Sequence, residues 1–122
     1  MKEIIAMIRP KMMTKTKDVL EKTGIPSMTA LPVLGRGKQQ GIVGEVNIEY
    51  RPQILEQKNR RMKYIPKRML SIIVKDDEVD TVIKSLIEVN HTGEFGDGKI
   101  FICPVDDVLR VRTGENGENA IA

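Results

Sequence analysis

The chain is poor in the residues that most metal and cofactor centres use. Its 122 residues include one cysteine, one histidine and no tryptophan. The lone cysteine, Cys103, excludes an intramolecular disulfide and a zinc site built from several thiolates. The lone histidine, His91, leaves no histidine pair for a metal or a catalytic centre. An aromatic content of 3% also argues against a sheet surface that stacks RNA bases.

Long hydrophobic runs are missing too. Hydrophobic residues make up 40% of the chain, but the longest runs, such as Ile4–Ile8, are far short of the roughly 20 residues that span a membrane. The start, Met1-Lys2-Glu3, leads into no hydrophobic segment of a secretion signal. The length suits one domain. We therefore expect a single domain over residues 1–122, cytoplasmic and without membrane insertion.

The basic charge is concentrated in one segment. The whole chain has a formal charge of +3, yet residues 35–67 contain eight lysines and arginines against three glutamates, a net charge of +5. This segment, with glycines at its start and a polar middle, interrupts the regular pattern and predicts a long loop over residues 36–67. Such a loop is a solvated surface segment, a docking arm for a partner, or an arm that binds phosphate.

Regular structure is predicted on both sides of this loop. Ile-rich and Val-rich runs predict strands at residues 3–8, 28–34, 69–74 and 100–103, with a short fifth strand at 108–112. Helical spacing of apolar residues predicts helices at 12–23 and from a cap at Asp76 to Asn90. Inside the loop, 42–48 could form a strand or hairpin and 53–63 a helical turn or two. The tail, 114–122, reads as loose.

The order β-α-β, long loop, β-α-β predicts an α+β fold, the ferredoxin-like sandwich of one antiparallel sheet with two helices on one face. The other face of the sheet would be bare. Because a bare apolar face in a small chain favours burial against further copies, we expect self-association with cyclic symmetry.

The chemistry is expected around Gly96-Asp97-Gly98-Lys99. Glycines let backbone amides approach a phosphate, and a lysine adds a positive charge, although a plain tight turn has the same composition. Arg110 and Arg112 would point the same way in a strand and suit a triphosphate, unless they form surface ion pairs. No base lies beside a nucleophile, and Cys103 reads as an inert core thiol, so we do not expect an enzyme.

At these residues the sequence resembles the PII family of nitrogen-regulatory signal proteins. The resemblance is clearest in Thr92-Gly-Glu-Phe-Gly-Asp-Gly-Lys-Ile-Phe-Ile102 and Arg110-Val-Arg-Thr-Gly-Glu115. It extends through Ile8-Arg9-Pro10, Gly35-Arg-Gly-Lys-Gln39 and Pro66-Lys67, so it covers nearly the whole chain in order.

The resemblance implies a homotrimer that binds ATP or ADP in clefts between subunits and 2-oxoglutarate beside Mg-ATP. By matching position, Thr29 would lie near the adenine, and Lys67 would pair with a carboxylate of 2-oxoglutarate. The remaining implied ligand-binding residues are Gly37, Lys38 and Gln39 at the loop base and, around the phosphates, Gly96, Asp97, Gly98, Lys99, Arg110 and Arg112. Gln39 would also be the side-chain ligand of Mg²⁺.

The loop is longer than is usual in the family and resembles that of the nitrogenase-associated PII-like proteins, in particular the second, longer member of that pair. This implies direct inhibition of dinitrogenase, in a complex with a sister subunit, relieved by 2-oxoglutarate and ATP. The alternatives are regulation of an ammonium transporter or of another nitrogen-assimilation enzyme, nucleic-acid binding by the basic loop, and slow ATP turnover. We do not expect nucleic acid as the partner.

Overall fold

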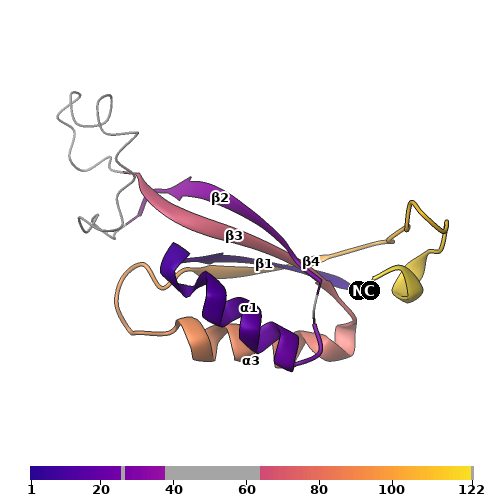
Figure 1. Cartoon of the computed structure of the whole chain (residues 1–122), viewed down its shortest axis with the longest axis horizontal. Coiled ribbons are helices and arrows are strands. Elements are labelled where there is room, and N and C mark those ends of the chain that lie inside the picture. The colour runs from indigo at the N-terminus through magenta and orange to yellow at the C-terminus, as the bar shows by residue number, and fades with distance from the viewer. Residues whose placement is uncertain (26, 38–63, 122) are drawn as a thin grey trace.

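A computed structural model describes residues 1–25, 27–37 and 64–121 (Figure 1). Its four strands form one sheet in the order β2-β3-β1-β4, and every neighbouring pair is antiparallel. The elements are β1 (Lys2–Ile8), α1 (Met13–Lys22), β2 (Thr29–Gly35), β3 (Ile65–Val74), α3 (Val79–Asn90) and β4 (Lys99–Pro104), with single 3-10 turns at Pro10–Met12, Asp76–Glu78 and Gly117–Ala120. This is the predicted ferredoxin-like α+β fold. None of the helices within the described ranges is long and apolar enough to cross a membrane.

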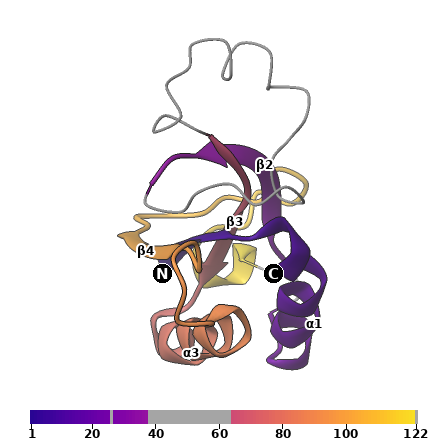
Figure 2. The ribbon, with the colours of Figure 1, turned by 90° about the vertical axis from the view of Figure 1, so that its left-hand side faces the viewer.

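The core lies between the sheet and the two helices, which run side by side beneath it (Figure 2). Strand residues alternate between two faces, so every second residue of the central strands turns toward the helices. The fully buried side chains come from both layers: Ile4, Leu70, Ile72 and Val74 from the strands, and Thr16, Leu20, Val82 and Leu86 from the helices.

A buried polar pair joins the two helices. The Asn90 amide donates to the Thr16 hydroxyl oxygen at 3.1 Å, and the Thr16 hydroxyl donates to the Met12 carbonyl at 2.7 Å. Because a buried amide N–H is costly without an acceptor, this bond favours the observed contact between α1 and α3. Both predicted helices are confirmed, with α1 starting one residue later than expected, although Ile87 of the predicted apolar stripe is exposed.

None of the described helices covers the opposite face of the sheet (Figure 1). The strand registers place Ile5, Met7, Leu31, Val33, Met69 and Phe101 on this open face. Leu31 and Phe101 are each 47% exposed. The predicted bare apolar face is therefore present in the single chain.

Strand β3 begins earlier than predicted, at Ile65 rather than at residue 69. Lys67 therefore lies on a strand, opposite Val33, and not in the loop. The strand can contain Pro66 because the pairing of β1 with β3 stops at Arg68, so Pro66 has β2 alone as a neighbour. A proline is tolerated where its missing N–H faces no partner strand.

The predicted cap of the second helix is wrong. Asp76 lies in a 3-10 turn that precedes α3. Its Oδ1 forms an ion pair with the Met1 ammonium nitrogen at 2.9 Å. The hydrogen bond from this ammonium lowers the pKa of Asp76. The turn is instead held by Glu78, whose carboxylate accepts the Lys75 backbone N–H at 3.0 Å.

The C-terminal segment also differs from the prediction. Residues 108–112 form no strand: Leu109 makes an isolated bridge with Asn116, and the chain turns at 111–113. Nor is the tail loose up to Ile121, because Gly117–Ala120 forms a 3-10 turn with Ala120 buried. Glycines at positions 114 and 117 adopt positive φ angles of 75° and 67°, which allow this reversal.

Cys103 is not a core residue either. It is half-buried in β4, in register with Glu3 and therefore on the open face of the sheet. The expectation rested on the apolar neighbours of Cys103, but successive strand residues alternate between the two faces, and Cys103 faces away from the helices. The elements expected at 42–48 and 53–63 lie outside the described residues.

Candidate functional site

The glycine-rich turn between α3 and β4 is organised by the carboxylate of Asp97. Its Oδ2 accepts the backbone N–H groups of Thr92 and Gly93 at 2.8 and 2.9 Å, and its Oδ1 accepts the Thr92 hydroxyl. These bonds, the one from the Thr92 hydroxyl first, hold the pKa of Asp97 well below its usual range. The carboxylate therefore stays ionised and ties the two ends of the turn together.

Arg9 fastens this turn to the sheet. It follows the last residue of β1, is only 7% exposed, and donates to Asp97 Oδ1 at 2.8 Å and to the Phe95 carbonyl at 3.0 Å. A buried guanidinium is stable when paired and hydrogen-bonded in this way. Arg9 had not been predicted as part of the site. Its signal in the sequence is a charged residue directly after an apolar strand and before Pro10.

Two glycines of the turn are required by backbone geometry. Gly96 and Gly98 have φ angles of 100° and 112°, which side chains rarely allow. A Cβ atom on Gly98 would also overlap the Met7 carbonyl oxygen. The absence of a side chain at Gly98 thus lets β4 start directly against β1.

Beside the turn lies a cleft of about 620 Å³ on the open face of the sheet. It brings together five of the residues predicted for ligand binding: Gly37, Lys67, Gly96, Gly98 and Lys99. Met7, Val33 and Phe101 form its apolar wall. The Lys67 ammonium donates to the Gly96 carbonyl at 2.7 Å, so the strand cation and the turn are already in contact. Asp97 lines a smaller hollow of about 290 Å³ beside α3 rather than this cleft.

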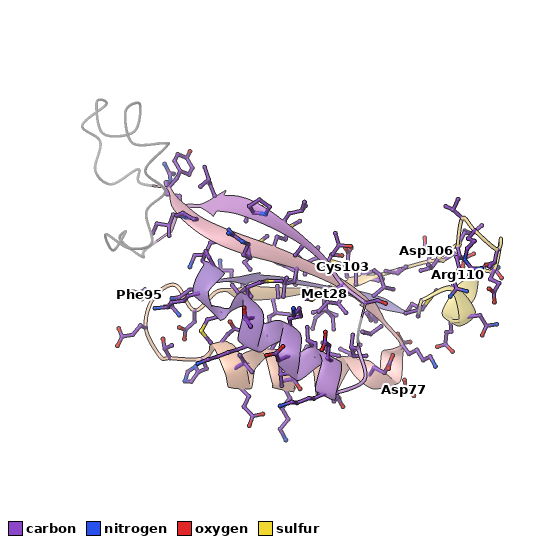
Figure 3. The ribbon with its side chains drawn as sticks, viewed as in Figure 1. Met28, Asp77, Phe95, Cys103, Asp106 and Arg110 are labelled. Atoms are coloured by element: carbon purple, nitrogen blue, oxygen red, sulfur yellow. The ribbon has the colours of Figure 1, made fainter. Side chains whose placement is uncertain are left out.

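Other predicted residues lie away from the cleft or outside the described part of the chain. Thr29 is opposite Ser71, about 13 Å along β3 from the Lys67 position, given a rise of about 3.3 Å per residue. Arg110 lies at the end of the molecule opposite to Phe95, far from the cleft (Figure 3). Lys38 and Gln39, the predicted Mg²⁺ ligand, lie outside the described residues. Within the ranges described, no three histidine, cysteine, aspartate or glutamate residues gather as a metal site.

Arg110 and Arg112 do not form the expected pair on a strand, because the chain turns between them. Arg110 donates to Glu115 Oε1 at 2.7 Å and to the Asn119 carbonyl at 2.9 Å, whereas Arg112 is exposed on the turn. A single chain therefore presents two separate groups of candidate residues, one at the cleft and one at the C-terminal end. One ligand can touch both groups only if they come from different copies.

Comparison with known proteins identifies the chain. The family model for the nitrogen regulatory protein P-II matches residues 1–115. The chain belongs to the PII family. The turn that carries Gly96 and Gly98 and the C-terminal turn at Arg110 both lie inside the matched range.

The relatives that are most informative show which PII subfamily this protein resembles. It is 54% identical over 121 residues to nitrogen fixation nifHD region GlnB-like protein 2 of Methanothermobacter marburgensis, covering 99% of this chain and 100% of that protein. It is 55% identical over 122 residues to the corresponding nifHD1 region protein of Methanosarcina barkeri, covering 99% of each. The resemblance to the nitrogenase-associated PII-like subfamily is thereby confirmed.

A solved PII structure agrees with the fold. The protein matches Arabidopsis thaliana PII bound to citrate with a TM-score of 0.74 and 36% identity, covering 98% of this chain and 88% of that one. Membership of the PII family gives the protein a role in nitrogen signalling as a regulatory protein.

Proposed function

We propose that this PII protein binds ATP or ADP, and 2-oxoglutarate beside Mg-ATP, in clefts between the subunits of a homotrimer. Through its long loop, which joins β2 to β3 over residues 36–64, it would regulate dinitrogenase by direct contact. The observation that supports this most is the cleft on the open face, where two lysines converge with glycine backbone amides.

The cleft suits a polyphosphate chemically. Lys67 and Lys99 supply two positive charges, and the glycines at 96 and 98 leave the backbone accessible to a ligand. Successive backbone N–H groups in a glycine turn form a concave site for anions. Asp97 does not oppose the phosphates there, because its carboxylate is satisfied by Arg9, Thr92 and Gly93. Asp97 instead stabilises the turn from the side away from the cleft.

Neighbouring copies would complete the site. Thr29, Arg110 and Arg112 lie away from the cleft in their own chain, so they would act on the cleft of the next subunit. The open apolar face gives the copies a surface to bury, which stabilises association in proportion to the apolar area removed from water. The arginines then add bidentate contacts to the phosphates.

Lys67 is the proposed partner of 2-oxoglutarate. Its ammonium is held at the cleft by the Gly96 carbonyl, so a ligand carboxylate would form an ion pair with a positioned cation. The Arabidopsis protein is described as bound to citrate, also a small carboxylic acid. For this chain that comparison supports a carboxylate site and leaves the choice of 2-oxoglutarate to experiment.

The proposed partner follows from the relatives and the loop. The related proteins are named for a nitrogen-fixation gene region, and residues 35–67 carry the basic excess of this chain. A basic loop can dock on an acidic groove of a large enzyme. Ligands at the loop base would control docking only if they bind the two loop states with different affinities.

Isothermal titration calorimetry tests the ligands directly, with ATP, ADP, and 2-oxoglutarate in the presence of Mg-ATP. A pull-down from nitrogen-fixing cells, with and without 2-oxoglutarate and Mg-ATP, tests the partner. We expect dinitrogenase, with or without a sister PII-like subunit, to be retained only without the ligands. Retention of an ammonium transporter or another nitrogen-assimilation enzyme instead would replace dinitrogenase as the target.

A further inference from the structure

Glu3 is the one acidic side chain that the described strands place on the open face of the sheet. Glu3 belongs to β1 and is in register with Ile73 and Cys103, which places it on the face away from the helices. The Ser71 hydroxyl donates to Glu3 Oε2 at 2.6 Å. This bond holds the half-buried carboxylate in one orientation across two neighbouring strands.

The Glu3–Ser71 pair lies next to Thr29. Ser71 is the register partner of Thr29 in β2 and of Ile5 in β1. Side chains of such directly opposed residues are about 5 Å apart at their Cβ atoms and share one face. Thr29, Ser71 and Glu3 therefore form a short polar row across three strands, with apolar residues on either side.

Covering this face requires hydrogen-bond donors for Glu3. An ionised carboxylate only accepts, and it has room for several donors, of which Ser71 supplies one. Burying a charge without donors is strongly unfavourable. Any assembly that covers the open face must therefore bring donors to Glu3 or leave it in contact with water.

We propose that Glu3 accepts a hydrogen bond from the nucleoside part of the nucleotide bound in the cleft of a neighbouring copy. This inference rests on the proposed function, which puts Thr29 of one copy beside the adenine of that ligand. The available donors are the two ribose hydroxyls and the exocyclic amino group of adenine. A carboxylate repels phosphates, whereas Lys67 and Lys99 attract them, so the two ends of the shared site set the direction of the nucleotide.

The test is calorimetric titration of the wild type and of Glu3→Gln with ATP, ADP and inorganic tripolyphosphate. The glutamine keeps the size of the side chain but replaces one acceptor oxygen by a donor. We expect ATP and ADP to bind about tenfold more weakly, the effect of losing a hydrogen bond to a charged group. Tripolyphosphate, which has no nucleoside, should bind both proteins alike. Glu88→Gln, on the exposed side of α3, is the matched control and should bind like the wild type.

Nucleotide analogues identify the donor. We expect one of 2′-deoxy-ATP, 3′-deoxy-ATP and inosine triphosphate to bind the wild type weakly and to be insensitive to Glu3→Gln. Ser71→Ala should give a smaller loss for ATP, because it frees the carboxylate without removing it. Analytical ultracentrifugation of each variant, without ligand, checks that assembly is unchanged.

The outcomes separate this inference from the proposed function. A wild type that binds neither ATP nor ADP would refute the proposed function itself. Wild-type binding with no loss in Glu3→Gln would overturn the role of Glu3 alone. Three further results would also overturn it, since each assigns Glu3 a purely structural role. The first is that Glu3→Gln weakens the binding of ATP and of tripolyphosphate equally, and the second is that it changes the oligomeric state. The third is that Glu3→Gln affects the binding of all three analogues equally.

Discussion

Single residues set the shape of the glycine-rich turn, and Gly98 tests this most directly. Alanine at this position would have to adopt a φ of 112° and would overlap the Met7 carbonyl oxygen. We expect Gly98→Ala to lower the free energy of unfolding by more than about 2 kcal/mol, because a strained φ alone costs about 1–2 kcal/mol. Urea unfolding followed by circular dichroism measures the change.

Gly93→Ala is the matched control for this prediction. Gly93 has a comparable φ of 88°, but no atom lies within 4 Å of the position of an added Cβ. Gly93→Ala should therefore lower the free energy of unfolding only by the cost of the backbone strain. Equal destabilisation by both substitutions would mean that the close approach of Gly98 to β1 has no energetic weight.

Asp97 should make the stability of the turn depend on pH. The pKa of its carboxyl is lowered in the folded protein, so its contribution is fully present above the unfolded value of about 3.9 and is lost as the pH falls toward the folded pKa. We expect Asp97→Asn to be less stable than the wild type at pH 7, with the difference shrinking below about pH 4. Urea unfolding at pH 7, 5 and 3.5 gives both curves. A difference that is constant with pH would show that charge is irrelevant to the role of Asp97.

Lys67 separates the two proposed ligands. Lys67→Ala removes the cation that would pair with the 2-oxoglutarate carboxylate, so calorimetry in the presence of Mg-ATP should detect no binding of 2-oxoglutarate. ADP binding should persist, because Lys99 and the turn amides remain. Lys84→Ala, exposed on α3, serves as the control. An unaltered response to 2-oxoglutarate would exclude this role of Lys67.

At the scale of elements, the long loop should be separable from the domain. The pairing of β2 with β3 is complete from Thr29–Ser71 to Gly35–Ile65 without the residues between them. We expect deletion of residues 43–62 to leave the fold and ATP binding intact and to abolish partner binding, because the loop is the proposed docking surface. Ultracentrifugation, calorimetry and an assay of dinitrogenase inhibition measure the three properties. Continued inhibition by the shortened protein would refute docking through the loop.

At the scale of the whole molecule, the shared site predicts complementation between defective copies. Lys99→Ala removes a cation from the cleft half of a site, and Arg110→Ala removes one from the other half. Each should weaken ATP binding by about 1–3 kcal/mol. When equal amounts of the two are unfolded and refolded together, random mixing in a cyclic trimer should produce about a quarter of the sites with both halves intact. Calorimetry should detect this tight class. Its absence from mixed, verified trimers would show that each site is built within one chain.

The fold was predictable from the sequence because the strands and helices have clear periodicities. Val79, Val82 and Leu86 follow helical spacing, and Ile4, Ala6 and Ile8 alternate along β1, so local pattern and burial agree. The start of β3 was missed because residues 66–68, Pro-Lys-Arg, carry no apolar pattern and continue the polar composition of the loop. The turn at 111–113 was missed because Leu109 and Val111 alternate as they would in a strand.

The site was predictable only in part, for a different reason. Glycine, lysine and arginine can be assigned to phosphate chemistry from the sequence, but their meeting depends on long-range packing. Arg9 and Asp97 are 88 positions apart and form one of the bonds that hold the turn. No local pattern contains that pair.

The sequence by itself determined the class of fold, the bare apolar face and the kinds of group that can hold an anion, because periodicity and side-chain chemistry are local properties. Only the tertiary structure decided which of these groups share a surface. It placed Lys67 and Lys99 together beside the glycine turn, moved Arg110 to the far end, and set Glu3 on the open face. These arrangements follow from strand register, and register is settled by the packing of the whole sheet.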